Sequence, residues 1–305
     1  MQTTDFLKRR IQSAQDLLGV VKTMKALAAV SIRQYQRAVE SLAEYNRTVE
    51  MGLQVVLRES RATAMHPGSR APLIGAVVFG TDQGLCGQFN NNIAHHALEE
   101  LEKTGVPRER RIVITIGLRP LDLLEDAGQH VFEALPTPGS TSGITAMVQD
   151  ITFLLEDWRF KRHIESMYLF YNDHISGANY RPKALCILPV DERWLKDLRQ
   201  RRWESKTLPL FTMDWERLFR ALIREYLFVS IYRAFANSLA SENASRLAAM
   251  QSAEKNIEER LEELFIQFHR QRQMTITEEL LDIVSGFEAM GGSREAVSKH
   301  RASTG

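Results

Sequence analysis

The chain has 305 residues, of which 44% are hydrophobic and 25% are charged, a composition typical of a globular protein. Its 39 Lys and Arg residues nearly balance its 38 Asp and Glu residues, so no global charge excess indicates a nucleic-acid or acidic-membrane partner. Two cysteines, Cys86 and Cys186, are too few for a disulfide scaffold or a zinc site. No apolar run is long enough to span a bilayer, and the first residues resemble neither a signal nor a transit peptide, so we expect a cytoplasmic protein.

A long helix is predicted at the start of the chain, over residues 4–57. Positions that step alternately by four and three residues from Leu7 to Val56 are apolar except at Lys25 and Asn46, and no proline interrupts them. This heptad repeat predicts a coiled-coil helix about 80 Å long, which needs a partner helix of similar length. We assign the N-terminal coiled-coil domain to residues 1–62.

An α/β domain is predicted over residues 70–210, after the helix breaker His66-Pro67-Gly68-Ser69. Because short apolar runs alternate with helix-like stretches, we expect a mostly parallel sheet. The stretches 135–143 and 172–182 are expected to be irregular. The expected strands are 73–79, 111–116, 166–171 and 184–189, and the expected helices are 91–103 and 145–161.

A second long helix is predicted over residues 213–290, the C-terminal coiled-coil domain. Its apolar stripe slips by one residue at Leu261 and Leu264 and resumes near Ile276, which resembles a stutter in a coiled coil. We expect the two terminal helices to pair as an antiparallel coiled coil with the α/β domain inserted between them. The longer C-terminal helix must then protrude at one end or meet another protein. The Gly- and Ser-containing tail, 291–305, is expected to be disordered.

The glycine-rich string at 79–90 follows a predicted strand and precedes a predicted helix, where α/β sheets bind ligands. It lacks the lysine of a P-loop, and its glycine spacing is not that of a dinucleotide fingerprint. A tight turn that needs glycine backbone angles is the other interpretation. Neighbouring His95 and His96 point about 100° apart on a helix and cannot hold one metal ion together. We therefore predict no cofactor, no metal and no catalytic residue.

Two further stretches indicate protein contacts. The start of the first helix is rich in Lys and Arg, which favours either a solvated face or an acidic protein partner. Nucleic acid is a weaker alternative because no aromatic residues interleave with these charges. The mixture of polar and apolar residues in the string 272–286 is not typical of a buried core, so we expect this helix end to contact a partner.

Three groups of strings resemble one family, the γ subunits of F-type ATP synthases, in the right order and up to about residue 290. The first is Ile11-Gln12-Ser13 followed by 22–29, Lys-Thr-Met-Lys-Ala-Leu-Ala-Ala. The second is 81–87, Thr-Asp-Gln-Gly-Leu-Cys-Gly, with Asn90. The third joins 238–250 to 277–286 near the end of the chain.

The resemblance implies an antiparallel coiled coil with a Rossmann-like domain, acting as the central rotor shaft of an F-type ATP synthase and without catalysis of its own. The implied partners are the α and β subunits of the catalytic hexamer, the ε subunit and the membrane ring of c subunits. The implied location is peripheral, at the cytoplasmic face of a bacterial or archaeal plasma membrane. By the same resemblance, the residues that meet the α and β subunits are Met24, Lys25, Arg246, Arg272, Gln273, Thr277 and Glu279.

The chain also departs from the family pattern. Phe287 follows Gly286 where the family usually has Gly-Ala, and Val30-Ser31 replaces the usual lysine after an Ala-Ala pair. These departures suggest a divergent branch, such as the alternate F-type ATPase carried beside a housekeeping enzyme. Two other functional classes stay open on the residues alone: a coiled-coil adaptor, and a nucleotide-binding enzyme that uses the glycine turn.

Overall fold

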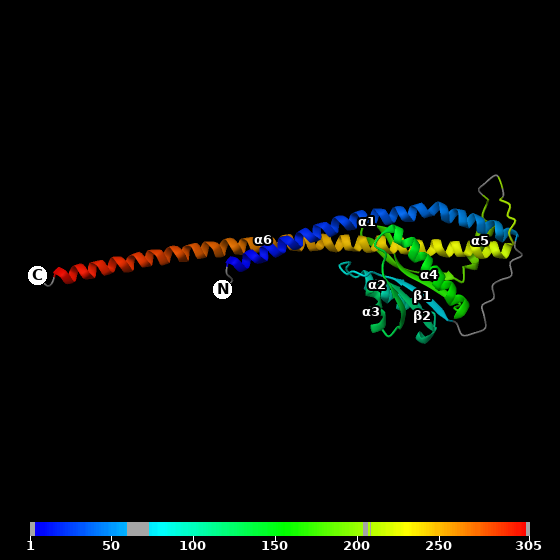
Figure 1. The fold of residues 1–305 in the computed structure, drawn as a ribbon, viewed down its shortest axis with the longest axis horizontal. Coiled ribbons are helices and arrows are strands. Elements are labelled where there is room, and N and C mark those ends of the chain that lie inside the picture. The colour runs from blue at the N-terminus through cyan, green and yellow to red at the C-terminus, as the bar shows by residue number, and fades with distance from the viewer. Residues whose placement is uncertain (1–3, 60–72, 204–206, 208, 303–305) are drawn as a thin grey trace. The chain divides into compact units, whose positions relative to one another are not determined.

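A computed structural model describes residues 4–59, 73–203, 207 and 209–302. Two long helices, α1 (Thr4–Glu59) and α6 (Trp215–Ala302), occupy the two ends of the chain, and the segment between them forms a five-stranded sheet with helices (Figure 1). This arrangement confirms the predicted fold class. The chain divides into two compact units, residues 25–250 and residues 1–24 together with 251–305. The predicted domain boundaries cut the chain differently and remain a prediction.

The sheet of the larger unit has the strand order β3-β2-β1-β4-β5. Its central strand, β1 (Ile74–Phe79), is buried at every position, because helices cover both faces of the sheet and demand a continuous apolar run. The pairs β1–β2, β1–β4 and β2–β3 are parallel, and only β5 runs antiparallel to its neighbour. The mostly parallel sheet is therefore confirmed. The remaining strands are β2 (Arg111–Ile116), β3 (Val131–Leu135), β4 (Ser166–Ser176) and β5 (Asn179–Leu188).

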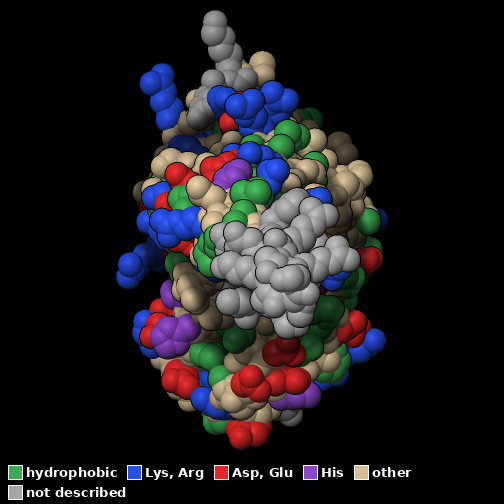
Figure 2. Space-filling view, turned by 90° about the vertical axis from the view of Figure 1, so that its left-hand side faces the viewer, with side chains coloured by type: hydrophobic (Ala, Val, Ile, Leu, Met, Phe, Trp, Pro, Cys, Tyr) green, Lys and Arg blue, Asp and Glu red, His purple; other side chains and the backbone are tan. Residues whose placement is uncertain are grey.

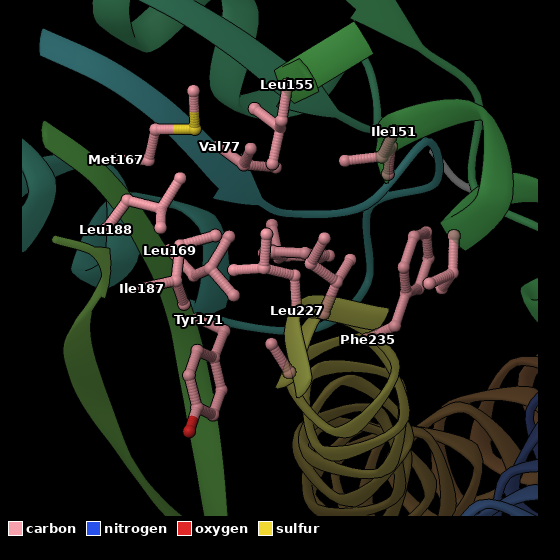
Figure 3. Close-up of a cluster of buried hydrophobic side chains, with 14 of the residues drawn as sticks. Val77, Ile151, Leu155, Met167, Leu169, Tyr171, Ile187, Leu188, Leu227 and Phe235 are labelled. Atoms are coloured by element: carbon pink, nitrogen blue, oxygen red, sulfur yellow. The ribbon is translucent and has the colours of Figure 1, made fainter. Parts of the chain in front are cut away.

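Each face of the sheet has its own apolar core. Helices α2 (Phe89–Lys103) and α3 (Arg119–Asp126) pack on one face. On the other face, α4 (Thr141–Lys161) and α5 (Glu192–Gln200) join the parts of α1 and α6 that belong to this unit. Figure 3 shows Leu227 and Phe235 of α6 directed toward apolar side chains of the sheet and α4. The sheet and the long helix thus share one hydrophobic core.

Within residues 25–250, α1 and α6 run antiparallel. The hydroxyl of Tyr45 donates a 2.5 Å hydrogen bond to Glu225. Further along α1, Gly52 approaches Leu222 so closely that an added Cβ would lie 2.9 Å from its Cδ2 atom. As the residue number rises on α1 it falls on α6, which is the antiparallel pairing expected of two long terminal helices with a domain inserted between them.

The smaller unit repeats this antiparallel pairing with its own contacts. Leu7, Ile11, Leu261 and Leu264 form a buried cluster, and Phe268 packs partly against it. Lys22 Nζ lies 3.3 Å from a carboxylate oxygen of Glu258. Leu261 and Leu264, to which the sequence analysis shifted the apolar stripe, are therefore buried. Ile276, where the stripe was expected to resume, is exposed.

The sequence prediction was wrong at two stretches of the α/β domain. Most of 172–182, expected to be irregular, belongs to the hairpin of β4 and β5. Strand β1 pairs with β4 only as far as Phe170, so the distal hairpin lacks the apolar alternation that marks a strand. The expected loop 135–143 is shorter than predicted, because β3 includes Leu135 and α4 begins at Thr141. Strand β3 and helices α3 and α5 were not predicted.

The C-terminal helix is also longer than the sequence prediction. Helix α6 continues past residue 290 to Ala302, so 291–302, expected to be a disordered tail, is helical. No proline follows residue 290, and Arg, Glu, Ala and Lys in this stretch favour a helix. Residues 60–62 of the predicted N-terminal domain and the last residues, 303–305, lie outside the described residues.

Candidate functional site

The predicted contact residues on α1 are half-buried. Met24 and Lys25 both have intermediate exposure. In the smaller unit, Leu17 and Val20 of α1 are exposed, and in the larger unit Leu27 and Val30 of the same helix are exposed. The heptad pattern predicted the buried row of α1 but not these four exposed apolar residues. The signal in the sequence was a second set of apolar residues on the same helix, displaced from the first.

Four of the predicted contact residues lie at the exposed end of α6. Arg272, Gln273, Thr277 and Glu279 all project from the helix surface, and the hydroxyl of Thr277 donates a 2.9 Å hydrogen bond to the carbonyl oxygen of Gln273. The structure therefore places these four residues together on one stretch of helix. Their roles as partner contacts remain a prediction.

Apolar side chains surround these polar residues and are equally exposed. Leu281 is 60% exposed and Ile283 is 56% exposed. A helix that exposes apolar residues on several sides loses the free energy that their burial would supply, and such surfaces mark interaction sites. The exposed apolar residues of this stretch are Met274, Ile276, Leu280, Leu281, Ile283 and Val284.

Arg246 differs from the other predicted contact residues because it is engaged within the chain. Its side chain is 11% exposed and forms a 2.6 Å ion pair with Glu242 on the preceding turn of α6. A second bond, 3.4 Å long, joins it to the side-chain oxygen of Asn243. Burial raises the pKa of Glu242, and the Arg246 guanidinium opposes this rise. The contact of Arg246 with another subunit stays a prediction.

The glycine-rich string forms a self-contained hydrogen-bonded turn. The side-chain oxygen of Asn90 accepts a 3.0 Å bond from the backbone N–H of Thr81, and its amide group donates a 2.9 Å bond to the Thr81 hydroxyl. Leu85 and Gly87 take positive φ angles, of 64° and 56°. The carboxylate of Asp82 lies in the same turn and would repel a phosphate. The geometry accounts for this string as a turn that joins β1 to α2.

The histidine pair does not form a joint site. His95 contacts Glu99 at 3.2 Å, whereas the ring of His96 packs edge-on against Phe170. The described part of the chain contains no group of three or more His, Cys, Asp or Glu residues placed to hold a metal ion. Within 4–59, 73–203, 207 and 209–302, no helix combines the length and hydropathy that crossing a membrane requires.

Figure 2 shows acidic and basic side chains interspersed with hydrophobic ones on the face that it draws, without one sign of charge covering it. This agrees with the near-zero net charge of +1. A uniformly basic surface, the feature expected of a nucleic-acid-binding protein, is not what this face presents.

The family comparison and the comparison with curated relatives identify the same kind of protein. A family model described as ATP synthase matches residues 3–290. An ATP synthase gamma chain of Pasteurella multocida (strain Pm70) is 26% identical over 93% of this chain and 98% of the relative. Another, from Buchnera aphidicola subsp. Diuraphis noxia, is 24% identical over 93% of this chain and 97% of the relative.

Solved structures share the fold at lower identity. A chain of the Euglena gracilis mitochondrial ATP synthase, from a structure of OSCP/F1/c-ring, has a TM-score of 0.63 at 16% identity and covers 95% of each chain. A chain of the Tetrahymena thermophila mitochondrial ATP synthase, from its central stalk/cring, has a TM-score of 0.53 at 19% identity. It covers 77% of this chain and 99% of the other.

Proposed function

The chain belongs to the ATP synthase family, and we propose that it is the γ chain of an F-type enzyme, the central shaft that couples rotation to nucleotide chemistry in other subunits. The family match over residues 3–290 and the curated relatives named ATP synthase gamma chain support this proposal. The chain would itself be non-catalytic.

The observation that carries the proposal is the exposed apolar end of α6. The side chains from Met274 to Val284 are far more exposed than an apolar helix tolerates in water, so a surrounding protein surface is expected to cover them. In the proposed complex this surface is the interior of the hexamer of α and β subunits. The exposed residues Leu17, Val20, Leu27 and Val30 of α1 would meet the same kind of surface.

The mechanism follows from asymmetry. A single shaft inside a threefold arrangement of catalytic sites presents a different face to each site. Nucleotide affinity at each site then depends on the contacts that the shaft makes there, and this coupling is reciprocal. Ion flow that turns the shaft would drive ATP synthesis, and ATP hydrolysis would turn it in the opposite direction.

The partners and location follow from the same proposal. One similar chain of known structure comes from an OSCP/F1/c-ring structure and another from a central stalk/cring structure, which supports the α/β hexamer and the c-ring as partners. We propose the ε subunit as a further partner. The chain would be a peripheral subunit of a membrane complex, at the cytoplasmic face of the plasma membrane.

Reconstitution tests the proposal. Purified α and β subunits from the same source are mixed with the full chain, and the complex is isolated while its subunit stoichiometry and ATP hydrolysis are measured. A single copy per hexamer, with sustained turnover that depends on adding the chain, is the expected result. Absence of a complex, with turnover unchanged, would favour a coiled-coil adaptor of another system. Nucleotide binding by the isolated chain would favour the enzyme alternative.

A further inference from the structure

Besides the ion pair of Arg224 with Glu156 of α4, three polar side chains of α6 bond to the α/β domain. Asn237 donates a 3.0 Å hydrogen bond to the carboxylate of Asp173. Ser241 donates a 2.9 Å bond to the backbone carbonyl oxygen of Asn172. Ser245 donates a 2.6 Å bond to the backbone carbonyl oxygen of Cys86. We call Asn237, Ser241 and Ser245 the polar row.

The polar row has a regular geometry. Its members are four residues apart, so their side chains lie on one side of the helix. Ser241 is fully buried and Ser245 is 9% exposed, so water does not readily replace their bonds. Two of the three acceptors are backbone carbonyl oxygens, which the strand β4 and the glycine turn hold in place. Pro182, paired with Asn172 in β5, has no N–H to donate to that carbonyl.

The Arg224–Glu156 ion pair is exposed to water, whereas the bonds of Ser241 and Ser245 are buried. Apolar contacts also join α6 to the domain, but they restrain rotation less. The rings of Phe79 and Phe235 meet edge to face at 5.0 Å, and Leu227 lies in the same core (Figure 3). Burial of apolar surface is not directional, whereas a hydrogen bond weakens steeply when its angle changes. Turning α6 about its own axis by one residue would move all three donors of the polar row off their acceptors together.

The covalent connections are one of two kinds of link between the α/β domain and the long helices. The α/β domain is joined to α1 through the segment after Glu59 and to α6 through the segment after Gln200. The second connection reaches α6 at its first residue, Trp215, so the polar row lies further along the helix. A torque that acts between α6 and the α/β domain must therefore pass through non-covalent contacts as well as through these connecting segments.

We propose that the polar row is a torsional lock, which fixes the rotational position of α6 against the α/β domain and transmits torque between them. The inference rests on the proposed shaft function, because only a rotating part experiences such a torque. Asn237, Ser241 and Ser245 are then positioning residues: they touch no nucleotide and act by keeping two parts of the shaft in register.

The experiment uses the assembled complex of α, β and the full chain. The hexamer is immobilised, and a load is attached to α2 through a Lys103→Cys variant in which exposed Cys186 is replaced by Ser. The torsional stiffness of the shaft is obtained from the angular fluctuations of the load when the rotor is stalled. Hydrolysis without a load is measured in parallel.

The variant Ser241→Ala with Ser245→Ala is compared with a matched control, Ser230→Ala with Ser252→Ala. Ser230 bonds to Tyr226 of its own helix, and Ser252 is exposed, so the control removes hydroxyls without touching the polar row. We expect the stiffness of the polar-row variant to fall by roughly twofold or more, because directional bonds are lost, while unloaded hydrolysis and the control stay unchanged. The conservative Ser245→Thr variant, which keeps the hydroxyl, should retain the stiffness.

Stiffness equal to that of the unmodified chain in an assembled polar-row variant would overturn the inference. If the double variant does not assemble, Asn237→Ala is measured in the same way, and unchanged stiffness there also overturns it. Failure of the proposed function is recognised separately, because the unmodified chain would then not assemble with the hexamer or turn the load at all.

Discussion

The carboxylate of Asp82 accepts hydrogen bonds from both the backbone N–H and the hydroxyl of Thr137, at 2.8 and 2.7 Å, although 55 residues separate the two. Its other oxygen accepts a 3.1 Å bond from the backbone N–H of Leu118. One side chain thus joins the loops that follow β1, β2 and β3, at the carboxyl ends of the parallel strands, where open α/β sheets generally bind ligands.

Replacing Asp82 by Ala should lower the free energy of unfolding by about 2 kcal/mol, because two backbone N–H groups and a hydroxyl lose a charged acceptor. Chemical denaturation of the full chain measures the change. Asp126→Ala is a suitable control, since Asp126 is an exposed carboxylate at the end of α3 in the same domain. Equal effects of the two substitutions would contradict a structural role for Asp82.

Gly117 has no room for a side chain. Its φ angle is +92°, and an added Cβ would lie 2.6 Å from backbone atoms of Thr81. We expect Gly117→Ala to destabilise the domain by about 3 kcal/mol or more, through backbone strain and overpacking together. Gly139→Ala is the matched control, because nothing lies within 4 Å of an added Cβ there. Similar midpoints of thermal unfolding for both variants would contradict the conclusion that Gly117 has no room for a side chain.

The buried pair of Glu242 and Arg246 should show strong coupling. Removing either partner leaves the other charge buried without its counter-charge, which costs about 3 kcal/mol of stability. The double variant Glu242→Gln, Arg246→Met should cost less than the sum of the single variants by about 2 kcal/mol. Denaturation of all four proteins gives this coupling energy. Simple additivity would mean that the two side chains act independently.

Burial of Glu242 also makes the free energy of unfolding depend on pH. Burial raises the pKa of this carboxyl from its ordinary value of 4.5. Between the ordinary and the raised pKa, the folded chain keeps a proton that the unfolded chain has lost, so the free energy of unfolding falls as the pH rises through this window. The fall is complete above the raised pKa. In Glu242→Gln this contribution to the slope should disappear, and stability curves that keep the same pH slope would contradict it.

The exposed end of α6 provides a functional test. In the reconstituted complex, Arg272→Ala with Gln273→Ala should lower coupled ATP synthesis by roughly thirtyfold, because each side chain is expected to make a polar contact worth about 1 kcal/mol. The isolated variant chain should fold normally, because both residues are exposed. Arg270→Ala with Gln267→Ala removes the same residue types from exposed positions of the same helix and is the control. Unchanged coupling in the first variant would remove Arg272 and Gln273 from the contact set.

The sequence predicted the long helices better than the details of the α/β domain. The heptad repeat of apolar residues from Leu7 to Val56 is a strong signal, because a long pair of helices has one repeating interface. Strand β3 and helix α3 are short, and their burial depends on neighbours distant in the sequence, so local patterns did not find them.

The candidate contact residues also show that local sequence patterns do not reveal long-range packing. The resemblance selected Arg246 and Arg272 alike, and the sequence alone does not distinguish them. In the structure Arg272 is exposed, whereas Arg246 is paired with Glu242 in a largely buried position. The difference depends on where the α/β domain packs against α6, which is a long-range property. For the same reason, the polar row could not be separated from any other set of small polar residues on a helix.

Rotation of the chain itself tests the account most directly. A load is attached to the Lys103→Cys position of the full chain in a complex with immobilised α and β subunits, and ATP is added. The account predicts continuous rotation in one direction, with pauses at the threefold-related positions of the hexamer. A load that only fluctuates about one angle while the same complex hydrolyses ATP would contradict the proposal that this chain is the rotating shaft.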